Sequence, residues 1–522
     1  MDSLSHRFFH FSFGSLRFPI FMLVLQSILR YVEYFQDAPP LALASVNAHA
    51  RECSEHHSRG VLRCTVTSGD YGVRRALTLN SSDVPRLECT LWWLATPLGF
   101  SLRVVVTFNG KKSLDDIPVL ENFSQRLSQN KAEYAFELRI YGFDSLSPFT
   151  MLLLQKTDEI ILGECVLTSL ESLKGLERLT KVTFWECRDS LDLDPLALCR
   201  SLTCVNVFHC RGVTSQDALG ELRNLRVVML RGVKLTNVDF LKDCPMLEFA
   251  TASHSETLIS LDGLFGLHHL KSVNVGATSI TSIRSLSACV ALEEVIVSGC
   301  RHLASLDGIS GLPKLKTLKA ENTGITSIRD LAGCAALEAV QLSKCEALTS
   351  LTGLAGMKNL KYVTAAYSAI TDIRCLTECA ALEEVKVNEC QQLNNLDGLS
   401  RLGNLRLVNA CFSGVEDIRS LAGCVALEEV QLIRCQKLTS LEGLSGLSNL
   451  RIVNAAYSGI ADVRGLSGCV ALEKVNVAYC QKLRSLEGLS ALPNLRTVDA
   501  TGTGVPRGTH LEGCPALETI VF

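Results

Sequence analysis

Cysteine is the residue type with the most chemical potential in this sequence, with 22 among 522 residues. Thiols can pair into disulfides, bind zinc or act as nucleophiles, and their spacing separates these roles. Sixteen recur in two regular ladders, without the C-x-x-C spacing of a zinc module. The first ladder is Cys165, Cys187, Cys210, Cys300, Cys345, Cys390, Cys435 and Cys480, and the second is Cys199, Cys244, Cys289, Cys334, Cys379, Cys424, Cys469 and Cys514. Regular ladders predict small buried thiols, and so many free thiols favour a reducing compartment.

Other candidates for chemistry are few. The stretch "CSEHHSRGVLRC", which holds Cys53, His56, His57 and Cys64, comes nearest to a metal cluster, but its spacing matches no zinc module. The eleven histidines are scattered, and the motifs G-x-x-x-x-G-K-S/T, H-E-x-x-H and G-x-S-x-G do not occur. We therefore expect no catalytic residues, no metal and no cofactor, and we do not expect an enzyme.

The elements that must carry the cysteine ladders are repeats. "SLDGLFGLHHL" begins at Ser260, and variants of it follow every 45 residues, at Ser305, Ser350, Asn395, Ser440 and Ser485. Each unit contains two L-x-x-L-x-L patterns, whose spacing fits a short strand with its second and third apolar residues facing inward. Continuing the alternation of 22 and 23 residues predicts strand starts from Thr157, or from the weaker candidate Ala135, to Leu517. This gives about eighteen turns of a solenoid.

The repeat accounts for both cysteine ladders. The first ladder lies eight residues after each strand start, where a small polar side chain can turn inward to meet backbone groups of the neighbouring loop. The alternate turns carry Thr278, Thr323, Ser368, Ser413, Ser458 and Thr503 at this position. The second ladder lies three residues before the strand starts, where the other turns have leucine. We therefore predict that sixteen cysteines have a structural role.

The sign of the charged residues also alternates between the two turns of each 45-residue unit, which we call a doublet. One residue after successive strand starts come Lys271, Glu293, Lys316, Glu338, Lys361, Glu383, Arg406, Glu428, Arg451, Glu473, Arg496 and Glu518. A second row reads Asp262, Arg284, Asp307, Arg329, Thr352, Arg374, Asp397, Arg419, Glu442, Arg464 and Glu487. Opposite charges on adjacent strands attract mildly. We therefore expect the arginines to pair within the array rather than to form an anion-binding stripe.

Binding is expected on the exposed, concave strand face. Aromatic and apolar side chains that should point outward there are Tyr362, Tyr367, Leu407, Cys411, Phe412, Ile433, Ile452, Tyr457 and Tyr479, with a smaller group of Trp185, Phe208 and His209. Exposed together, they suggest a protein contact surface over residues 362–479. The alternative is that the rings only pack on one another along the ladder. The net charge of −3 and the low aromatic content of 6% argue against a nucleic-acid partner.

The amino-terminal third does not repeat. "FPIFMLVLQSIL", from Phe18 to Leu29, is too short to span a bilayer as a helix, so no membrane contact is expected. As a signal peptide it has Arg7 and Arg17 in front, but the small-residue pattern at Ala42–Ala44 lies far behind it. Asn109-Gly110 predicts a β-hairpin turn inside a small α/β region. We expect three parts: a hydrophobic helical region (1–60), a small α/β capping domain (61–130) and the repeat array (131–522).

The array, about residues 135–522, resembles leucine-rich repeat proteins that mix the cysteine-containing type of F-box receptors with the 22-residue type of internalins. The near-identical doublets are most similar to leucine-rich repeat proteins of trypanosomatid parasites. The resemblance implies an α/β-type leucine-rich repeat solenoid with a parallel β inner face, a short 3-10 or irregular convex side and a small N-terminal α/β region. It also implies protein binding without a fixed partner.

Residues 18–53 resemble a degenerate F-box, through Pro19, "ILRY" at Ile28–Tyr31 and "LALASVNAHAREC" at Leu41–Cys53. This resemblance implies docking on the adaptor of a cullin ubiquitin ligase, and hence a cytoplasmic substrate receptor. A signal or anchor and an ordinary capping helix stay open as alternatives. With the sequons at Asn80 and Asn122, the first of these would give a secreted or cell-surface recognition protein. The sequence stops at Phe522, within the strand of its last turn, so two alternatives stay open: the open edge pairs with another chain, or the gene is cut short.

Overall fold

The computed structural model describes residues 61–68, 74–80, 100–109, 117, 134–188 and 190–522. The chain divides into two compact units, Met1–Arg59 and Gly60–Phe522, and every described residue lies in the second. The F-box-like segment, the apolar run and the side chains of the Cys53–Cys64 stretch lie outside the described residues. Within the described ranges, no helix is long and apolar enough to cross a membrane.

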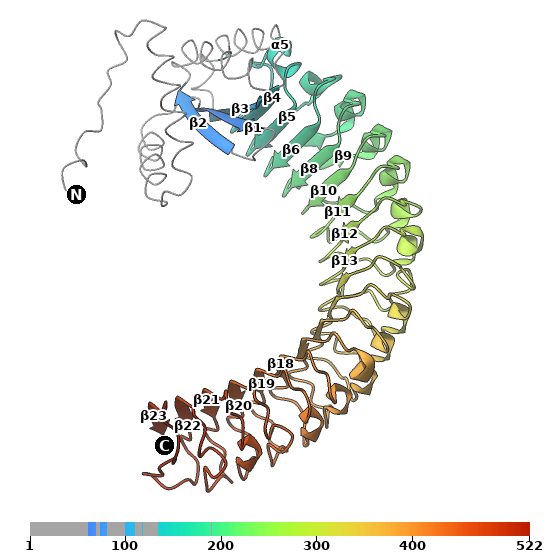
Figure 1. Cartoon of the computed structure of the whole chain (residues 1–522). Coiled ribbons are helices and arrows are strands. Elements are labelled where there is room, and N and C mark those ends of the chain that lie inside the picture. The colour runs from blue at the N-terminus through green and yellow to red at the C-terminus, as the bar shows by residue number, and fades with distance from the viewer. Residues whose placement is uncertain (1–60, 69–73, 81–99, 110–116, 118–133, 189) are drawn as a thin grey trace, which may run out of the picture. The chain divides into compact units, whose positions relative to one another are not determined.

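The second unit is a coil whose successive turns contribute strands to one sheet, in which 21 strands are described (Figure 1). At its beginning, β1 (Val61–Ser68) pairs antiparallel with β2 (Arg74–Asn80) and with β3 (Phe100–Asn109). From β3 onward each strand pairs in parallel with the next strand of the sheet. These strands are β4 (Tyr134–Tyr141), β5 (Glu159–Gly163), β6 (Lys181–Trp185), β8 (Cys204–Phe208), β10 (Val227–Arg231), β11 (Phe249–Thr251), β12 (Ser272–Asn274), β13 (Glu294–Ile296), β14 (Thr317–Lys319), β15 (Ala339–Gln341), β16 (Tyr362–Thr364), β17 (Glu384–Lys386), β18 (Leu407–Asn409), β19 (Glu429–Gln431), β20 (Ile452–Asn454), β21 (Lys474–Asn476), β22 (Thr497–Asp499) and β23 (Thr519–Val521).

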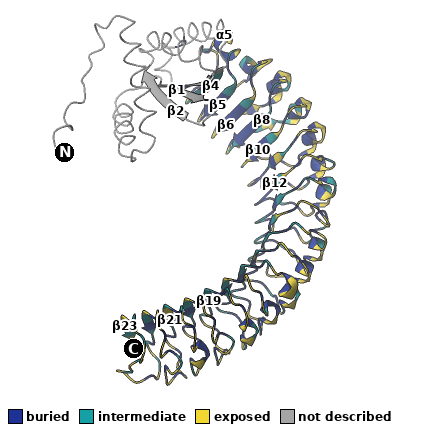
Figure 2. Cartoon of the chain, in the orientation of Figure 1, coloured by how far each residue is buried: buried dark blue, intermediate teal, exposed yellow. Residues whose placement is uncertain are grey.

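The predicted strand positions are confirmed from Thr157 to Leu517, and the weaker candidate at Ala135 falls inside β4. Each strand from β11 to β22 buries its middle residue and leaves the two flanking residues partly or fully exposed, as in β14, where Leu318 is buried between Thr317 and Lys319. Buried apolar side chains therefore form one continuous core under the sheet. Figure 2 shows that the strands are buried or partly exposed and that the exposed residues gather mainly on the convex turns. The predicted parallel inner face is confirmed.

The convex side is made of short 3-10 helices and irregular turns, as predicted. They span Glu171–Leu173, Asp194–Leu198, Asp217–Glu221, Asp239–Asp243, Asp262–Leu264, Arg284–Ala288, Arg329–Leu331, Thr352–Leu354, Arg374–Glu378, Asp397–Leu399, Arg419–Leu421 and Arg464–Leu466. The described part also holds α5 (Met151–Leu154) and a separate two-stranded sheet of β7 (Leu191–Asp192) and β9 (Val213–Ser215). In the turns that read "SLDG" the serine begins the turn: the Ser260 hydroxyl accepts a hydrogen bond from the Asp262 N–H at 3.1 Å.

Glycine recurs in that motif because successive turns touch there. A Cβ atom added at Gly353 would lie 1.8 Å from the carbonyl oxygen of Ile328, and one at Gly398 would lie 1.8 Å from that of Ile373. Any side chain would push the two turns apart. The glycine therefore recurs every 45 residues because adjacent turns are too close at this position for a side chain.

The predicted hairpin at Asn109-Gly110 is wrong. One edge of β3 pairs with β1 and the other with β4, so a strand returning after Asn109 has no free edge to join. The turn signal is local, whereas the partners of β3 come from residues 61–68 and 134–141. This pairing makes the antiparallel strands and the array one sheet.

Candidate protein-binding face

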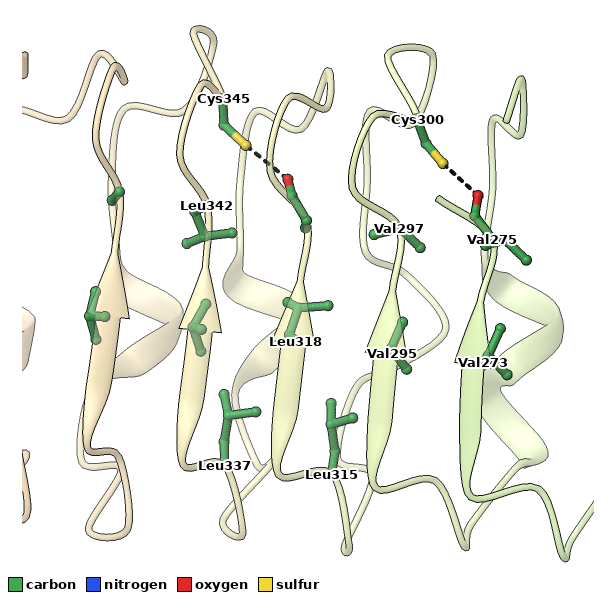
Figure 3. Close-up of a cluster of buried hydrophobic side chains, with 14 of the residues drawn as sticks. Val273, Val275, Val295, Val297, Cys300, Leu315, Leu318, Leu337, Leu342 and Cys345 are labelled. Carbon is green, nitrogen blue, oxygen red and sulfur yellow. Dashed lines mark hydrogen bonds between the residues drawn. The ribbon is translucent and has the colours of Figure 1, made fainter. Parts of the chain in front are cut away.

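The cysteine ladders lie inside the coil and bind backbone carbonyl groups. In the first ladder, the Cys300 thiol donates to the carbonyl of Val275 at 3.1 Å, and Cys345 donates to that of Ala320 at 3.1 Å (Figure 3). In the second, the Cys334 thiol donates to the carbonyl of Ile309 at 3.1 Å. All nineteen cysteines whose side chains the structure describes are free. The predicted structural role is confirmed, although Cys514 is partly exposed.

Burial raises the pKa of most of these thiols; Cys210 is an exception, because its hydrogen bond with Cys187 lowers its pKa. Desolvation raises the pKa of Cys289 and of Cys435 to about 11, and that of Cys375 to about 12. A thiol with a raised pKa is a poor nucleophile and a poor metal ligand at neutral pH. Nowhere in the described ranges do three or more histidine, cysteine or acidic side chains gather as they would around a metal ion.

The first charge row forms ion pairs between adjacent strands, as predicted, and its pairing direction changes along the array. Three lysines reach back to the preceding turn: Lys271 to Glu248 and Lys316 to Glu293, both at 2.6 Å, and Lys361 to Glu338 at 3.1 Å. The two arginines that follow reach forward to the next turn, Arg406 to Glu428 and Arg451 to Glu473, both at 2.8 Å. Glu383 lies where the direction switches, and no ion pair reaches it from any described residue.

The second charge row follows the prediction only in part. Arg284 pairs across turns with Asp307 at 2.7 Å, and Arg464 with Glu487 at 3.1 Å. Arg374 and Arg419 instead bind aspartates of their own turns, Asp372 at 2.6 Å and Asp417 at 2.5 Å. A carboxylate two residues before the arginine competes with the neighbouring turn. These guanidinium groups are engaged within the array rather than presented as a free stripe.

A column of residues with left-handed backbone runs along one edge of the concave face. It consists of Gly142, Glu164, Glu186, His209, Gly232, His254, Ala277, Gly299, Asn322, Lys344, Tyr367, Glu389, Phe412, Arg434, Tyr457, Tyr479 and Gly502, whose φ angles lie between 51° and 82°. Up to Tyr479, each N–H donates to a carbonyl of the next turn, as Tyr457 does to Ala478 at 2.8 Å. Residues other than glycine are energetically disfavoured at positive φ, so the large side chains at these positions require an explanation.

Four successive members of this column form a continuous stack, which we name the rim stack: Phe412, Arg434, Tyr457 and Tyr479. The Arg434 guanidinium carbon lies 5.3 Å from the ring centres of both Phe412 and Tyr457. The rings of Tyr457 and Tyr479 are stacked, with centres 4.5 Å apart and an angle of 11° between their planes. Rings held in this way present a rigid apolar edge to the solvent.

Beside the rim stack, apolar and acidic side chains alternate across five neighbouring strands. This groove stripe consists of Tyr362, Glu384, Leu407, Glu429 and Ile452, each paired in register with the next. The stripe lies in an open groove of about 320 Å³. Its lining is Tyr362, Glu383, Glu384, Arg406, Leu407, Glu428, Glu429, Arg451 and Ile452.

The predicted binding residues therefore lie in two adjacent rows. Tyr362, Leu407 and Ile452 belong to the groove stripe, and Phe412, Tyr457 and Tyr479 to the rim stack. Tyr367 occupies the rim column two turns before Phe412. The expected exposure of Cys411 is wrong, because only 8% of it is accessible, behind the rim.

The smaller predicted group lies apart from these rows, on β6 and β8. Trp185 is exposed, its ring centre lies 5.7 Å from that of Phe208, and its ring meets that of His209 edge to face. Rings therefore do pack on one another, as the alternative interpretation expects, both in this group and in the rim stack. Tyr457, Tyr479 and Trp185 nevertheless stay exposed, so packing and accessibility coexist.

Sequence reasoning missed Arg434 and the glutamates of the groove. The predicted binding residues are aromatic or apolar and do not include Arg434, although aligning the turns places it between Phe412 and Tyr457. The sequence places Glu383 and Glu428 in a charge row of alternating sign and does not single out Glu384 and Glu429. Which glutamates stay without an ion pair depends on whether each lysine or arginine pairs with the preceding or the following turn. The residue type alone does not determine this direction.

Comparison with known proteins agrees on the fold. A scan against protein-family models finds no match, and a search of curated proteins finds no matching sequence. Among solved structures, a leucine-rich repeat protein of Leptospira interrogans is similar at a TM-score of 0.56 and 14% identity, over 75% of this chain and 88% of its own. The Toll–Spätzle complex of Drosophila gives 0.57 at 14% identity, over 78% and 62%. The TLR13–ssRNA13 complex gives 0.51 at 13% identity, over 74% and 56%.

These similarities and the strand geometry define the class of the protein: its fold is a leucine-rich repeat solenoid. Solenoids of stacked repeats present extended concave surfaces, whose exposed side chains are the ones available for binding.

Proposed function

We propose that this chain is a non-enzymatic scaffold that binds a protein partner on the concave face of its array, over residues 362–479. The observation that carries the proposal is the exposure of large aromatic side chains in two adjacent rows. Tyr362, Tyr367, Tyr457 and Tyr479 are 42%, 48%, 44% and 45% accessible. Gathered aromatic side chains on a solvent-facing surface mark interaction sites, and tyrosine is enriched among the residues that dominate binding energy.

The backbone conformation of the rim supports the same proposal. Three aromatic residues of the rim stack occupy left-handed positions that glycine would fill at lower cost. Folding does not require them there, since Ala277 and Gly299 occupy the column elsewhere. A partner contact is a reason for aromatic side chains at these positions.

We further propose that the chain is a cytoplasmic substrate receptor, in which residues 18–53 dock on the adaptor of a cullin ubiquitin ligase. The F-box-like segment and the free thiols support this proposal. The similarity of the doublets to leucine-rich repeat proteins of trypanosomatid parasites belongs to the same proposal. The partner is proposed as a protein rather than a nucleic acid or a membrane, because the chain is slightly acidic and poor in aromatic residues.

Affinity purification from the cells that express the chain tests both steps. The intact chain is compared with a Tyr367→Ser, Phe412→Ser, Tyr457→Ser variant, a control Asn322→Ser, Lys344→Ser variant in the same column, and a deletion of residues 1–60. We expect client proteins to vanish only with the triple variant and adaptor components only with the deletion. Retention of every partner by the triple variant would rule out the concave face. A mobility shift after glycosidase treatment would instead support a secreted or surface recognition protein.

A further inference from the structure

We infer that the partner segment lying in the groove is basic, with lysine or arginine side chains interspersed with apolar ones. This inference rests on the proposed function, because it states the chemistry of the partner at the same face. Two observations carry it: the uneven charge of the groove and the alternation along the groove stripe.

The groove lining holds four glutamates and two arginines, and neither arginine is free for a ligand. Arg406 holds Glu428 through two bonds, from Nε to Oε1 at 2.8 Å and from Nη2 to Oε2 at 3.1 Å. Arg451 bonds Glu473, which lies outside the lining. An acidic partner would therefore meet repulsion and find both guanidinium groups occupied.

Two carboxylates of the groove have only neutral hydrogen-bond donors. Glu383 accepts from the Tyr362 hydroxyl at 3.2 Å, and Glu429 accepts from the Gln431 amide at 2.9 Å. Within the described ranges, neither forms an ion pair. A cationic side chain from a partner would add the charge-assisted bond that each lacks.

The same positions two doublets earlier show that this imbalance is not a property of the repeat. Glu293 aligns with Glu383, but Lys316 holds Glu293 at 2.6 Å, whereas no described cation forms an ion pair with Glu383. Glu294 and Glu384 also align, and both are held, by Lys319 at 3.0 Å and by Lys386 respectively. Their strand neighbours are Ser272 and Thr317 rather than apolar residues. Unpaired acidic charge and apolar surface thus coincide at the groove, and both are missing from its structural equivalent.

The alternation of the groove stripe sets the pattern of the partner. Neighbouring strands lie about 4.8 Å apart, so Glu384 and Glu429 recur about 9.6 Å apart, with Leu407 between them. Tyr362 and Ile452 extend the alternation on either side. A segment crossing the strands would meet apolar and acidic contacts in turn. Lys386 holds Glu384, but no described cation pairs with Glu429, so the stripe favours basic and apolar side chains in the same order.

Two fluorescent peptides and the full chain test the inference. One peptide repeats Lys-Leu-Gly and the other repeats Glu-Leu-Gly, and binding is measured by fluorescence anisotropy. We expect the intact chain to bind the lysine peptide at least about 10-fold more tightly, and less so when salt rises from about 50 to about 300 mM. Equal binding of the two peptides, or tighter binding of the glutamate peptide, would overturn the inference.

Matched variants locate the effect. A Glu383→Gln, Glu429→Gln variant should weaken lysine-peptide binding by about 5- to 10-fold, whereas a Glu293→Gln, Glu294→Gln variant should change it by less than about 2-fold. Equal losses in both variants would show general attraction to an acidic surface and overturn the inference. If neither variant weakens binding while the triple serine variant still loses its client, the basic partner is wrong and the proposed function stands. If the triple serine variant also keeps every client, both fail.

Discussion

Residues 271–344 and residues 361–479 have the same backbone and different surfaces. Both segments pair their strands in the same register over one continuous core, with the same cysteine ladders. In the first segment the rim column reads Ala277, Gly299, Asn322 and Lys344, and the stripe reads Ser272, Glu294, Thr317 and Ala339. In the second segment the same positions carry the rim stack and the groove stripe. The fold therefore does not explain the aromatic and acidic surface, which points to function.

The largest effect we predict is one that both segments share, the loss of stability at alkaline pH. Burial raises the pKa of Cys289 in the first segment and of Cys435 in the second to about 11, above the ordinary value of 9.0. A raised pKa contributes stability that is complete below pH 9 and is lost as pH rises through 11. The loss is about 1.4 kcal/mol per pH unit for each such thiol. Urea unfolding between about pH 8 and about pH 10.5 would measure it, and a flat profile would contradict the buried ladders.

Truncating the shared core should cost the same in either segment. Leu315 and Leu450 occupy the same position of the repeat, and both are fully buried. Leu315→Ala and Leu450→Ala should each lower the free energy of unfolding by about 2–5 kcal/mol, because each leaves a cavity under the sheet. Urea midpoints would measure both. A difference above about 1 kcal/mol would show that the two segments pack differently, and the comparison of their surfaces would lose its basis.

The shared framework is what the sequence predicts well. Leucines at L-x-x-L-x-L spacing fix the strand positions, because only one periodic arrangement buries all of them. The cysteine positions follow, since their thiols reach the carbonyls of the neighbouring turn, as Cys300 does to Val275. The same prediction for the serines and threonines is wrong: the Thr278 hydroxyl donates to the carbonyl of Val275, three residues earlier in its own turn, at 2.8 Å. The hairpin at Asn109-Gly110 failed because a local turn signal cannot reveal that distant strands occupy both edges of β3.

The surface is predicted only in part. The exposed aromatic residues follow from strand alternation, but the left-handed rim column does not, because Tyr, Phe and Arg disfavour positive φ. The excess negative charge of the groove also could not be predicted from the sequence. Lysines and arginines alternate with glutamates in both segments, and only the structure shows that Lys361 reaches back to Glu338 while Arg406 reaches forward to Glu428. Glu383 between them is left over.

A smaller effect should distinguish the two rims. Arg434 lies between two aromatic rings, whereas Lys344, at the same position of an earlier doublet, is exposed and forms no cation–π contact among the described residues. Arg434→Ala should therefore lower the free energy of unfolding by about 0.5–1 kcal/mol, and Lys344→Ala should change it by much less. Urea unfolding would measure both variants. Equal effects would mean that the rim stack adds no stability of its own.

The smallest effect tests why the second rim has large side chains at all. Lys344 has φ 63° and Tyr457 has φ 59°, both in the region that favours glycine. Lys344→Gly should raise the free energy of unfolding by up to about 1 kcal/mol, because it removes the penalty of a side chain at positive φ. Tyr457→Gly removes the same penalty but also loses the stacking on Tyr479, worth about 0.5–1.5 kcal/mol, so its net effect should lie near zero. A clear gain from Tyr457→Gly would mean that the stack does not offset the strain, and client binding would then be the stronger reason for the tyrosine.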